Sequence, residues 1–348
     1  MGIERLGAQA YNGYRRNCGA QYAHERKRKM KKVVLDGYTA CPDDPDYACF
    51  AAMGETTVYD RTPPELVVQR IADAPIILTN KTVISREVMD ACPEIKYIGV
   101  LATGYNVVDI EAAKERGIVV SNVPAYSTQA VVQHTMALLL HAFSRVSRYD
   151  ERVKRGDWVS SQDFCFFDGE TEEAADKVFG VIGYGHIGRA SAHAAQALGM
   201  RVLVYTPHPP KDRREGDPEF VTLEELLGES DVISLHCPLS EKTRGIIGGE
   251  NIGKMKRGVR VINTARGPLV DSGMMAQALE SGHVACYMAD VLEQEPPAAD
   301  DVLLGAKNTV ITPHIAWAPK QTRERLVRTA VGNALAFERG EPRNVVSG

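Results

Sequence analysis

Three closely spaced glycines constrain the fold of this chain more than any other stretch. Gly183, Gly185 and Gly188 follow an apolar run that is typical of the end of a buried strand. The Ala-rich segment 189–198 predicts a helix, and the apolar segment 201–206 predicts the next strand. In this context G-x-G-x-x-G is a dinucleotide-binding motif. The first glycine permits a tight turn, the second admits a pyrophosphate, and the third lets helix and strand pack closely.

The start of the helix after these glycines is a candidate phosphate site. We expect the helix to begin near His186, with Ile187 in its first turn. Its free N–H groups and positive dipole end would bind the phosphates of the dinucleotide.

The length and composition of the chain exclude several classes of protein. The length of 348 residues allows two domains with separate cores. A net charge of −4 predicts no general attraction to nucleic acid or anionic lipid, and no apolar run is long enough to span a membrane. The seven cysteines are scattered, with no zinc-ligand spacing, so we expect no metal site but reduced thiols in a cytoplasmic protein.

The first 29 residues differ from the rest of the chain. They are rich in Arg and Lys and lack an apolar period. Met30 directly precedes the first clear strand. We therefore interpret residues 1–29 as a loose basic tail or an over-extended gene start.

A first α/β domain is predicted from Met30 onward. The expected strands are 33–36, 57–60, 76–79, 97–101 and 118–121, and the expected helices are 65–72, 85–91 and 110–116. Short apolar strands that alternate with helices indicate a parallel sheet covered on both faces.

The rest of the chain predicts an inserted second domain. Segment 127–155 reads as one long helix, too apolar all round to be solvated, and fits either an interdomain helix or a subunit interface. Further strands are expected at 231–236, 259–263, 286–291 and 310–312, and a last helix at 320–337.

We therefore predict an α/β protein with two doubly wound parallel sheets. Its substrate domain would comprise 30–126 and 316–348, and its dinucleotide domain 127–315. The cleft between the domains is the expected active site.

Three polar residues follow strands of the second domain. Arg266 precedes a Gly-Pro turn, Glu295 ends an acidic loop, and His314 follows the strand 310–312. Alone, each has an ordinary explanation as a surface cation, a solvated turn or a core histidine. Together they occupy the carboxyl ends of strands in an open sheet, where such folds bind ligands.

These residue types suit the reduction of a 2-oxo acid beside a nicotinamide. Arg266 can hold the substrate carboxylate and polarise the carbonyl through its planar guanidinium. His314 can donate a proton as hydride arrives, and a carboxylate hydrogen-bonded to it favours the imidazolium. The sequence thus predicts an oxidoreductase.

These motifs identify a family. From about Met30 to Val345 the sequence resembles the D-isomer-specific 2-hydroxyacid dehydrogenases, most closely their glycerate dehydrogenase (hydroxypyruvate reductase) branch. The resemblance implies a flavodoxin-like substrate domain with an inserted Rossmann domain. It also implies that Arg266 binds substrate, that His314 is the acid/base, and that Glu295, rather than Glu293, is the histidine's partner.

The resemblance implies further site residues. In the first domain, backbone N–H groups near Thr103 and Gly104 would bind the substrate carboxylate. The residues expected to contact the cofactor are Gly183, Gly185, His186, Ile187, Gly188, Thr206, Cys237, Pro238, Thr264, Ala265 and Asp290. The long segment 127–155, with Trp158 and the aromatic run 164–167, resembles the family's dimerisation arm and predicts a homodimer.

One position departs from the pattern of NAD enzymes. An acidic residue usually follows the glycines by about 20 residues and bonds the adenosine ribose. Here that place is taken by Thr206, with His208, Lys211, Arg213 and Arg214 close behind. The choice between NAD and NADP is therefore open, and we expect NADPH to serve at least as well as NADH.

Several functions remain open. The leading hypothesis is a hydroxypyruvate or glyoxylate reductase that also oxidises D-glycerate. Another small 2-oxo acid, such as 3-phosphohydroxypyruvate, is an alternative, whereas formate dehydrogenase chemistry is disfavoured because it uses a glutamine where Glu295 stands. From a different class, the chain could be a cofactor-sensing binding protein, like the C-terminal-binding-protein corepressors.

Overall fold

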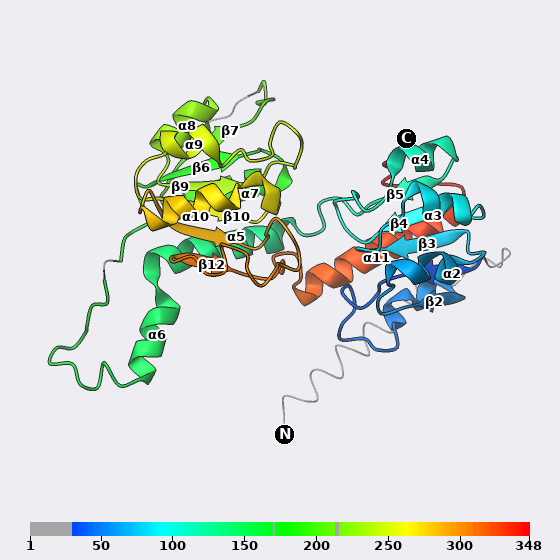
Figure 1. The fold of residues 1–348 in the computed structure, drawn as a ribbon, viewed down its shortest axis with the longest axis horizontal. Helices are drawn as coiled ribbons and strands as arrows, with labels where there is room; N and C mark the ends of the chain where they lie inside the picture. The colour runs from blue at the N-terminus through cyan, green and yellow to red at the C-terminus, as the bar shows by residue number, and fades with distance from the viewer. Residues whose placement is uncertain (1–29, 170, 213–215) are drawn as a thin grey trace. The chain divides into compact units, whose positions relative to one another are not determined.

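The computed structural model describes residues 30–169, 171–212 and 216–348, so the predicted tail 1–29 and the pair Arg213 and Arg214 lie outside the described residues. The chain forms two compact units (Figure 1). Among the described residues, the first unit contains 30–126 together with Pro319–Gly348, and the second is Ser127–Ala318.

The first unit is built on a five-stranded parallel sheet. Its strands are β1 (Lys32–Val34), β2 (Thr56–Val58), β3 (Ile76–Thr79), β4 (Tyr97–Val100) and β5 (Val119–Ser121). Their order, β2-β1-β3-β4-β5, is that of flavodoxin-like sheets.

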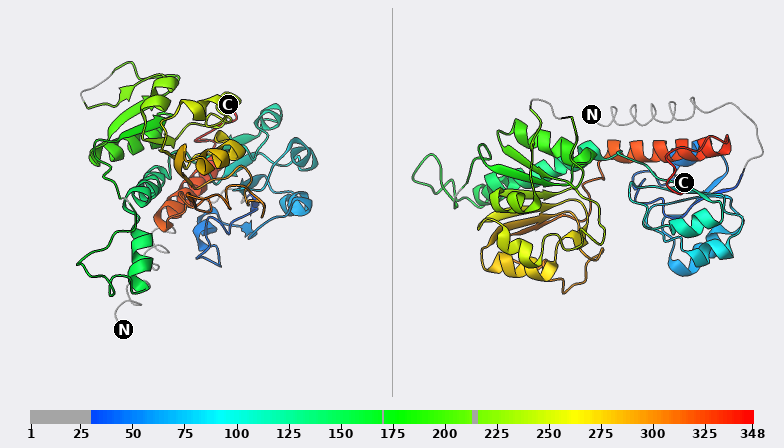
Figure 2. Two further views of the ribbon diagram at one scale, coloured as in Figure 1. Left: turned by 60° about the vertical axis from the view of Figure 1, so that its left-hand side comes forward. Right: turned by 90° about the horizontal axis from the view of Figure 1, so that it is seen from above.

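Helices cover both faces of this sheet (Figure 2). The short helices α2 (Val67–Ile71), α3 (Arg86–Ala91) and α4 (Ile110–Glu115) bury their apolar sides against one face. The 3-10 turn η2 (Pro64–Leu66), which buries no residue, leads directly into α2. The long helix α11 (Lys320–Glu338) and the 3-10 helix η1 (Ala48–Met53) belong to the other face. Tyr97 of β4 stacks on Phe337 of α11, with ring centroids 4.9 Å apart. The last helix of the chain thus completes the first unit.

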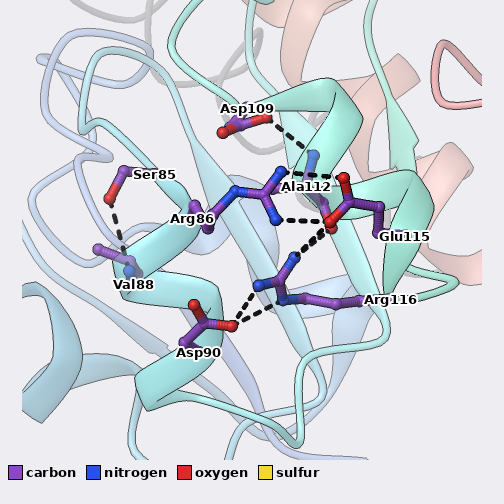
Figure 3. A network of polar contacts seen from close by, with 8 residues as sticks. All are labelled: Ser85, Arg86, Val88, Asp90, Asp109, Ala112, Glu115 and Arg116. Atoms are coloured by element: carbon purple, nitrogen blue, oxygen red, sulfur yellow. Dashed lines mark hydrogen bonds and ion pairs between the residues drawn. The ribbon is translucent and has the colours of Figure 1, made fainter.

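Helices α3 and α4 are joined by a surface network of polar contacts (Figure 3). Ser85 and Asp109 cap the two helices by accepting backbone N–H groups three residues on. The guanidinium of Arg86 donates to both carboxylate oxygens of Glu115, at 2.5 and 3.1 Å, and Arg116 also contacts Glu115. These pairs are solvent-exposed, so water screens them and they contribute little to stability.

The second unit contains a seven-stranded parallel sheet. Its strands are β6 (Val178–Ile182), β7 (Arg201–Tyr205), β8 (Glu219–Phe220), β9 (Val232–Leu235), β10 (Val259–Asn263), β11 (Val284–Ala289) and β12 (Thr309–Ile311). The order β12-β11-β10-β9-β6-β7-β8 is the Rossmann order with one additional edge strand. The predicted fold class of two doubly wound parallel sheets is confirmed.

Strand alternation decides which helices cover which face of the second sheet. Phe179 and Val181 of β6 pack with α5 (Thr128–Ser144) and α7 (His186–Ala197). Val178 and Ile182 belong to the opposite core, which contains residues of α8 (Leu223–Glu229), α9 (Gly249–Lys254) and α10 (Ser272–Glu280). Sequence patterning did not predict these last three helices.

The prediction of one continuous helix over 127–155 is wrong. Arg145 has a left-handed backbone, with φ of 52°, and separates α5 from α6 (Val146–Lys154). The Arg145 guanidinium donates to the backbone carbonyl of Asp168, on the segment that returns from the arm. Helix α6 buries no residue, and Figure 1 shows it standing away from the sheet of its own unit.

The described part of the chain lacks two kinds of feature. Within residues 30–169, 171–212 and 216–348, no helix is long and apolar enough to cross a membrane. The same residues contain no cluster of three or more His, Cys, Asp or Glu side chains that could hold a metal ion.

Candidate active site

Each of the three positions of the motif is occupied by glycine for a different structural reason. Gly183 has a φ of 97°, and a Cβ there would lie 2.6 Å from the backbone nitrogen of Cys237. A Cβ on Gly188 would lie 2.0 Å from the carbonyl oxygen of Gly183. A Cβ on Gly185 would meet nothing within 4 Å. The outer glycines therefore allow close packing of turn, strand and helix, and the middle one leaves the turn open to a ligand.

The first turn of α7 faces an open pocket. Gly185 is the N-cap residue and His186 the first helical residue, as predicted. The adjoining pocket has a volume of about 440 Å³. Its lining residues are Thr128, Gln129, Tyr184, Gly185, His186, Arg189, Ala190 and His193. An exposed helix start beside the cationic side chain of Arg189 fits the pyrophosphate of a dinucleotide.

The strand beside β6 ends close to the same turn. His236, directly after β9, donates its backbone N–H to Ile182 at 2.8 Å, and its Nε2 lies 2.9 Å from the Ser234 hydroxyl. Burial lowers the pKa of His236 to about 4 and raises the pKa of the Cys237 thiol to about 11. At neutral pH both groups are therefore uncharged beside the glycine turn.

The lowered pKa of His236 predicts acid sensitivity. Between pH 6.5 and 4 the unfolded chain binds a proton at this residue and the folded chain does not, so stability falls as pH falls. We expect His236 to contribute about 2 kcal/mol of the stability lost between pH 7 and pH 5. Urea unfolding at the two pH values should show a smaller loss in His236→Gln than in the wild type. The exposed His208→Gln should retain the full loss, and an unchanged loss in His236→Gln would contradict the assignment.

Arg266 lies in the turn between β10 and the 3-10 turn η3 (Gly267–Leu269). Its side chain is exposed, and Nη1 donates to the backbone carbonyl of Ala265 at 2.7 Å. No acidic side chain of the described residues forms an ion pair with this guanidinium. The cation is thus available for an external carboxylate.

Glu295 and His314 form the hydrogen-bonded pair that the sequence predicts. Glu295 Oε2 lies 2.5 Å from His314 Nδ1, and the two side chains are about one-third exposed. Glu295 Oε1 accepts the backbone N–H of Leu292 at 3.2 Å. The Leu292 carbonyl in turn leaves no space for a side chain at Gly267, the residue after Arg266. The Arg266 turn and the Glu295 loop are therefore packed together, and the His314 ring directs Nε2 away from Glu295.

Asp290 holds the backbone around His314. The Asp290 carboxylate is 1% exposed and accepts bonds from the Thr312 hydroxyl at 2.6 Å and from the N–H groups of Ile315 and Ala316, both at 2.8 Å. His314 itself has a φ of 54°, which a residue with a side chain adopts only when its surroundings impose it. The buried carboxylate supplies that constraint.

Comparison with known proteins assigns this arrangement to a family. Residues 136–316 match the family profile of the NAD-binding domain of D-isomer specific 2-hydroxyacid dehydrogenases. A hydroxypyruvate reductase of Blautia hydrogenotrophica is 50% identical over 321 residues, which cover 91% of this chain and 100% of that protein. The chain belongs to this family. The predicted resemblance, including its glycerate dehydrogenase branch, is confirmed, and the protein is an NAD(P)-dependent oxidoreductase.

Two further relatives agree. A glycerate dehydrogenase of Methylorubrum extorquens is 41% identical, and the match covers 81% of this chain and 88% of that protein. The crystal structure of a D-lactate dehydrogenase from Aquifex aeolicus, complexed with NAD and lactic acid, has a TM-score of 0.79 at 30% identity. The match covers 91% of the present chain and 99% of the Aquifex chain.

The remaining predicted site residues are placed as follows. Thr206 is half-buried directly after β7, and Pro238 is exposed after Cys237. Thr264 and Ala265 are half-buried in the Arg266 turn, and Ile187 is half-buried in α7. Thr103 and Gly104 lie in the first unit, in the loop after β4, where the Thr103 hydroxyl donates to the carbonyl of Val123 at 2.8 Å.

Sequence reasoning missed three polar residues that support this site. Asn263 precedes the Arg266 turn and is fully buried, Thr312 bonds Asp290, and His134 of α5 places Nε2 2.9 Å from the Thr312 hydroxyl. Asn263 and Thr312 could have been found from the sequence, because each is a polar residue at the end of an apolar strand. A buried polar group there needs a hydrogen-bond partner. His134 carried no such signal, because only the fold brings α5 to β12.

Proposed function

We propose that this dehydrogenase reduces hydroxypyruvate or glyoxylate with a nicotinamide cofactor and oxidises D-glycerate in the reverse direction. The observation that carries the proposal is the Glu295–His314 pair packed beside the Arg266 turn. Among the residues that the structure describes, none with an acidic side chain pairs with the Arg266 guanidinium. The relatives named hydroxypyruvate reductase and glycerate dehydrogenase support this substrate class.

Arg266 is proposed to bind the substrate. A guanidinium can donate two parallel hydrogen bonds to a carboxylate, or to one carboxylate oxygen and the neighbouring carbonyl oxygen of a 2-oxo acid. The second arrangement withdraws electron density from the carbonyl carbon. We also propose the backbone N–H groups near Thr103 and Gly104 as donors to the substrate carboxylate.

His314 is proposed as the general acid in reduction and the general base in oxidation. Because Glu295 occupies Nδ1 of the ring, the proton to be transferred resides on Nε2. In reduction, Nε2–H donates to the carbonyl oxygen, which becomes the hydroxyl of the product. Asp290 and Glu295 hold the backbone and the ring of His314, respectively, so that Nε2 keeps one position.

The cofactor, when bound, supplies or accepts the hydride. The residues proposed to hold it are the glycine turn 183–188, Thr206, Cys237, Pro238, Thr264, Ala265 and Asp290. The fit rests on the open backbone at Gly185 and on the pocket beside the first turn of α7.

An oxidation screen tests the proposed substrate. NADH and NADPH consumption is followed with hydroxypyruvate, glyoxylate, pyruvate, 3-phosphohydroxypyruvate and longer 2-oxo acids. We expect the highest kcat/KM with hydroxypyruvate or glyoxylate. A higher value with another 2-oxo acid would reassign the substrate, and cofactor binding without turnover of any would favour a cofactor-sensing protein.

The proposal includes use of NADPH at least as well as NADH. Thr206 carries no charge that would repel a 2′-phosphate, and Lys211 and His208 nearby are exposed. Replacing Thr206 by Asp introduces like-charge repulsion, which we expect to cost about 2 kcal/mol and to lower the NADPH/NADH ratio of kcat/KM about 30-fold. Steady-state kinetics with both cofactors measure the ratio. The uncharged Thr206→Asn is the matched control, and a strong NADH preference of the wild type would refute the proposal.

A homodimer formed through the arm is also proposed, the arm being α6 and residues 155–169. Trp158, Val159, Phe164 and Phe167 are 52, 91, 90 and 84% exposed, which is unusual for such side chains. Asp168 pairs with Arg152 at 2.9 Å and also with Arg148. These pairs hold the returning segment against α6, so the apolar side chains are presented on an ordered support.

Removing two of these aromatic side chains should weaken the dimer. Light scattering of the wild type is expected to give about twice 38.1 kDa. Each buried Phe contributes on the order of 2 kcal/mol, so Phe164→Ser with Phe167→Ser should raise the dimer Kd at least 100-fold. Val302→Ser, which alters a 52% exposed residue outside the arm, should not change the mass. A monomeric wild type would contradict the proposal.

We further propose a reducing compartment such as the cytoplasm. Cysteines 41, 49, 92, 165, 237 and 286 are all free thiols. Most of them are buried, and Cys41 and Cys49 lie within hydrogen-bonding distance of each other without forming a disulfide.

A further inference from the structure

Asn263, the last residue of β10, makes two hydrogen bonds to the backbone of the turn that carries Arg266. Its side chain is fully buried. The amide oxygen Oδ1 accepts the backbone N–H of Ala265 at 3.1 Å, and the amide nitrogen Nδ2 donates to the backbone carbonyl of Arg266 at 2.9 Å. One side chain therefore fixes both a donor and an acceptor of the turn, on either side of the peptide bond that joins Ala265 to Arg266.

Only an amide of this length satisfies both groups. A carboxylate of the same shape could accept from Ala265 but would place an oxygen against the Arg266 carbonyl. An aliphatic side chain would leave the N–H and the carbonyl without these bonds. The chemistry at this position thus requires asparagine, although the residue has no exposed atoms to offer a ligand.

The backbone of Asn263 is held firmly within the sheet. Asn263 pairs in register with Leu235 of β9 and Ala289 of β11, and its own carbonyl accepts the backbone N–H of Asp290 at 2.9 Å. On the other side of Arg266, a Cβ on Gly267 would lie 1.9 Å from the Leu292 carbonyl oxygen, so the turn cannot shift toward the Glu295 loop. The turn has one permitted place between the strand end and that loop.

The Arg266 guanidinium has little else to position it. Its side chain is exposed, and it donates a hydrogen bond to the carbonyl of the preceding residue in the same turn. The direction of the side chain is therefore set by the backbone conformation of residues 264–267.

We propose that Asn263 is a positioning residue that holds Arg266 in register with the substrate. This inference rests on the proposed role of Arg266 in binding the 2-oxo acid. Displacement of a substrate-holding group by about 1 Å can lower activity on the order of 100-fold, although no contact to the substrate itself is removed.

The expected signature is a selective effect on the oxo acid. In Asn263→Asp, and in the uncharged variant Asn263→Ser, the KM for glyoxylate or hydroxypyruvate should rise at least tenfold and kcat should fall less. The Kd of NADH, measured by its fluorescence in the absence of oxo acid, should change by a smaller factor than this KM, because Thr264 and Ala265 are only two of the residues proposed to hold the cofactor. A general loss of structure would instead lower the active fraction and leave KM unchanged.

A double-mutant cycle with Arg266→Ala decides between positioning and general destabilisation. If Asn263 acts through Arg266, Asn263→Ser should lower kcat/KM strongly in the wild type but less than about twofold in the Arg266→Ala background. Equal losses in both backgrounds would overturn the inference. Asn263→Asp provides the same comparison, so the cycle does not depend on one variant's stability.

Two control variants separate the effect of the Asn263 hydrogen bonds to the turn from the effect of losing other buried polar contacts. Tyr287→Phe removes another polar neighbour of Asn263, a hydroxyl 3.5 Å from Nδ2, and should leave KM unchanged. Ser230→Ala removes a fully buried hydroxyl that donates to Leu226 at 2.6 Å, far from the turn in sequence, and measures the effect of an unrelated buried hydrogen bond. If Arg266→Ala itself leaves kcat/KM unchanged, the proposed function fails. If Arg266→Ala is impaired and the Asn263 variants are not, only the present inference fails.

Discussion

Replacement of His314 by Asn is expected to lower kcat for oxo-acid reduction by about 10³-fold, because general acid catalysis by a positioned side chain contributes roughly 10²–10⁴-fold. The Glu295 contact is made by Nδ1, so the variant loses the proton donor at Nε2 and leaves the carboxylate without its histidine. Stopped-flow or steady-state NADPH oxidation at saturating hydroxypyruvate measures the loss. NADPH binding should be retained, because His314 is assigned no contact to the dinucleotide.

Glu295→Gln provides the matched comparison for this result. An amide keeps the size of the side chain and a contact to Nδ1 but removes the negative charge beside the ring. We expect a smaller loss of kcat than in His314→Asn, together with a change in the pH profile of kcat/KM. Full activity in His314→Asn would exclude it as the acid, and a larger loss in Glu295→Gln would assign proton transfer elsewhere.

Replacement of Arg266 by Ala is expected to lower kcat/KM for the oxo acid by about 10²–10³-fold. The variant removes charge-assisted hydrogen bonds to the substrate carboxylate, each worth about 1.5–3 kcal/mol. Because the carboxylate is bound in both the ground state and the transition state, most of the loss should be in KM. The fall in kcat should reflect only the weaker polarisation of the carbonyl.

Two variants check the interpretation of the Arg266 result. Arg266→Lys keeps the charge but not the planar pair of donors, so it should recover only part of the lost affinity. Arg257→Ala removes another exposed arginine of the same unit, one that donates to the Ser281 carbonyl at 2.9 Å, and should leave KM unchanged. An unaltered KM in Arg266→Ala would mean that the oxo acid is held by other groups.

Local sequence predicted the framework of this site because the framework is local. The turn at Gly183, the helix start at His186 and the end of β10 at Asn263 are set by residues within a few positions of one another. The polar residues after β10, β11 and β12 could be grouped from sequence, since parallel strands end at the same edge of a sheet.

Contacts between distant segments escaped prediction. Arg145 has an ordinary helix propensity, yet its backbone is left-handed and its side chain donates to an arm segment more than 20 residues later. Asn263 carries no charge and precedes the more conspicuous Arg266 by three residues, so only its two hydrogen bonds point to the role proposed for it. The contact of His134 with Thr312 joins residues 178 positions apart. Such residues are identified by packing, which a single sequence does not encode in any short pattern.

The insertion of the second unit between Tyr126 and Pro319 also determines the order in which the two units can fold during synthesis. Ser127–Ala318 is continuous and can fold as soon as it has been made, whereas the first unit lacks α11 until the chain is almost complete. At about 5–20 residues per second, the ribosome needs roughly 10–40 s to make the inserted segment. During that time the Tyr97 ring of β4, fully buried in the finished protein, lacks Phe337. The nascent first unit therefore exposes an apolar sheet face, which makes it the half of the molecule most in need of a chaperone.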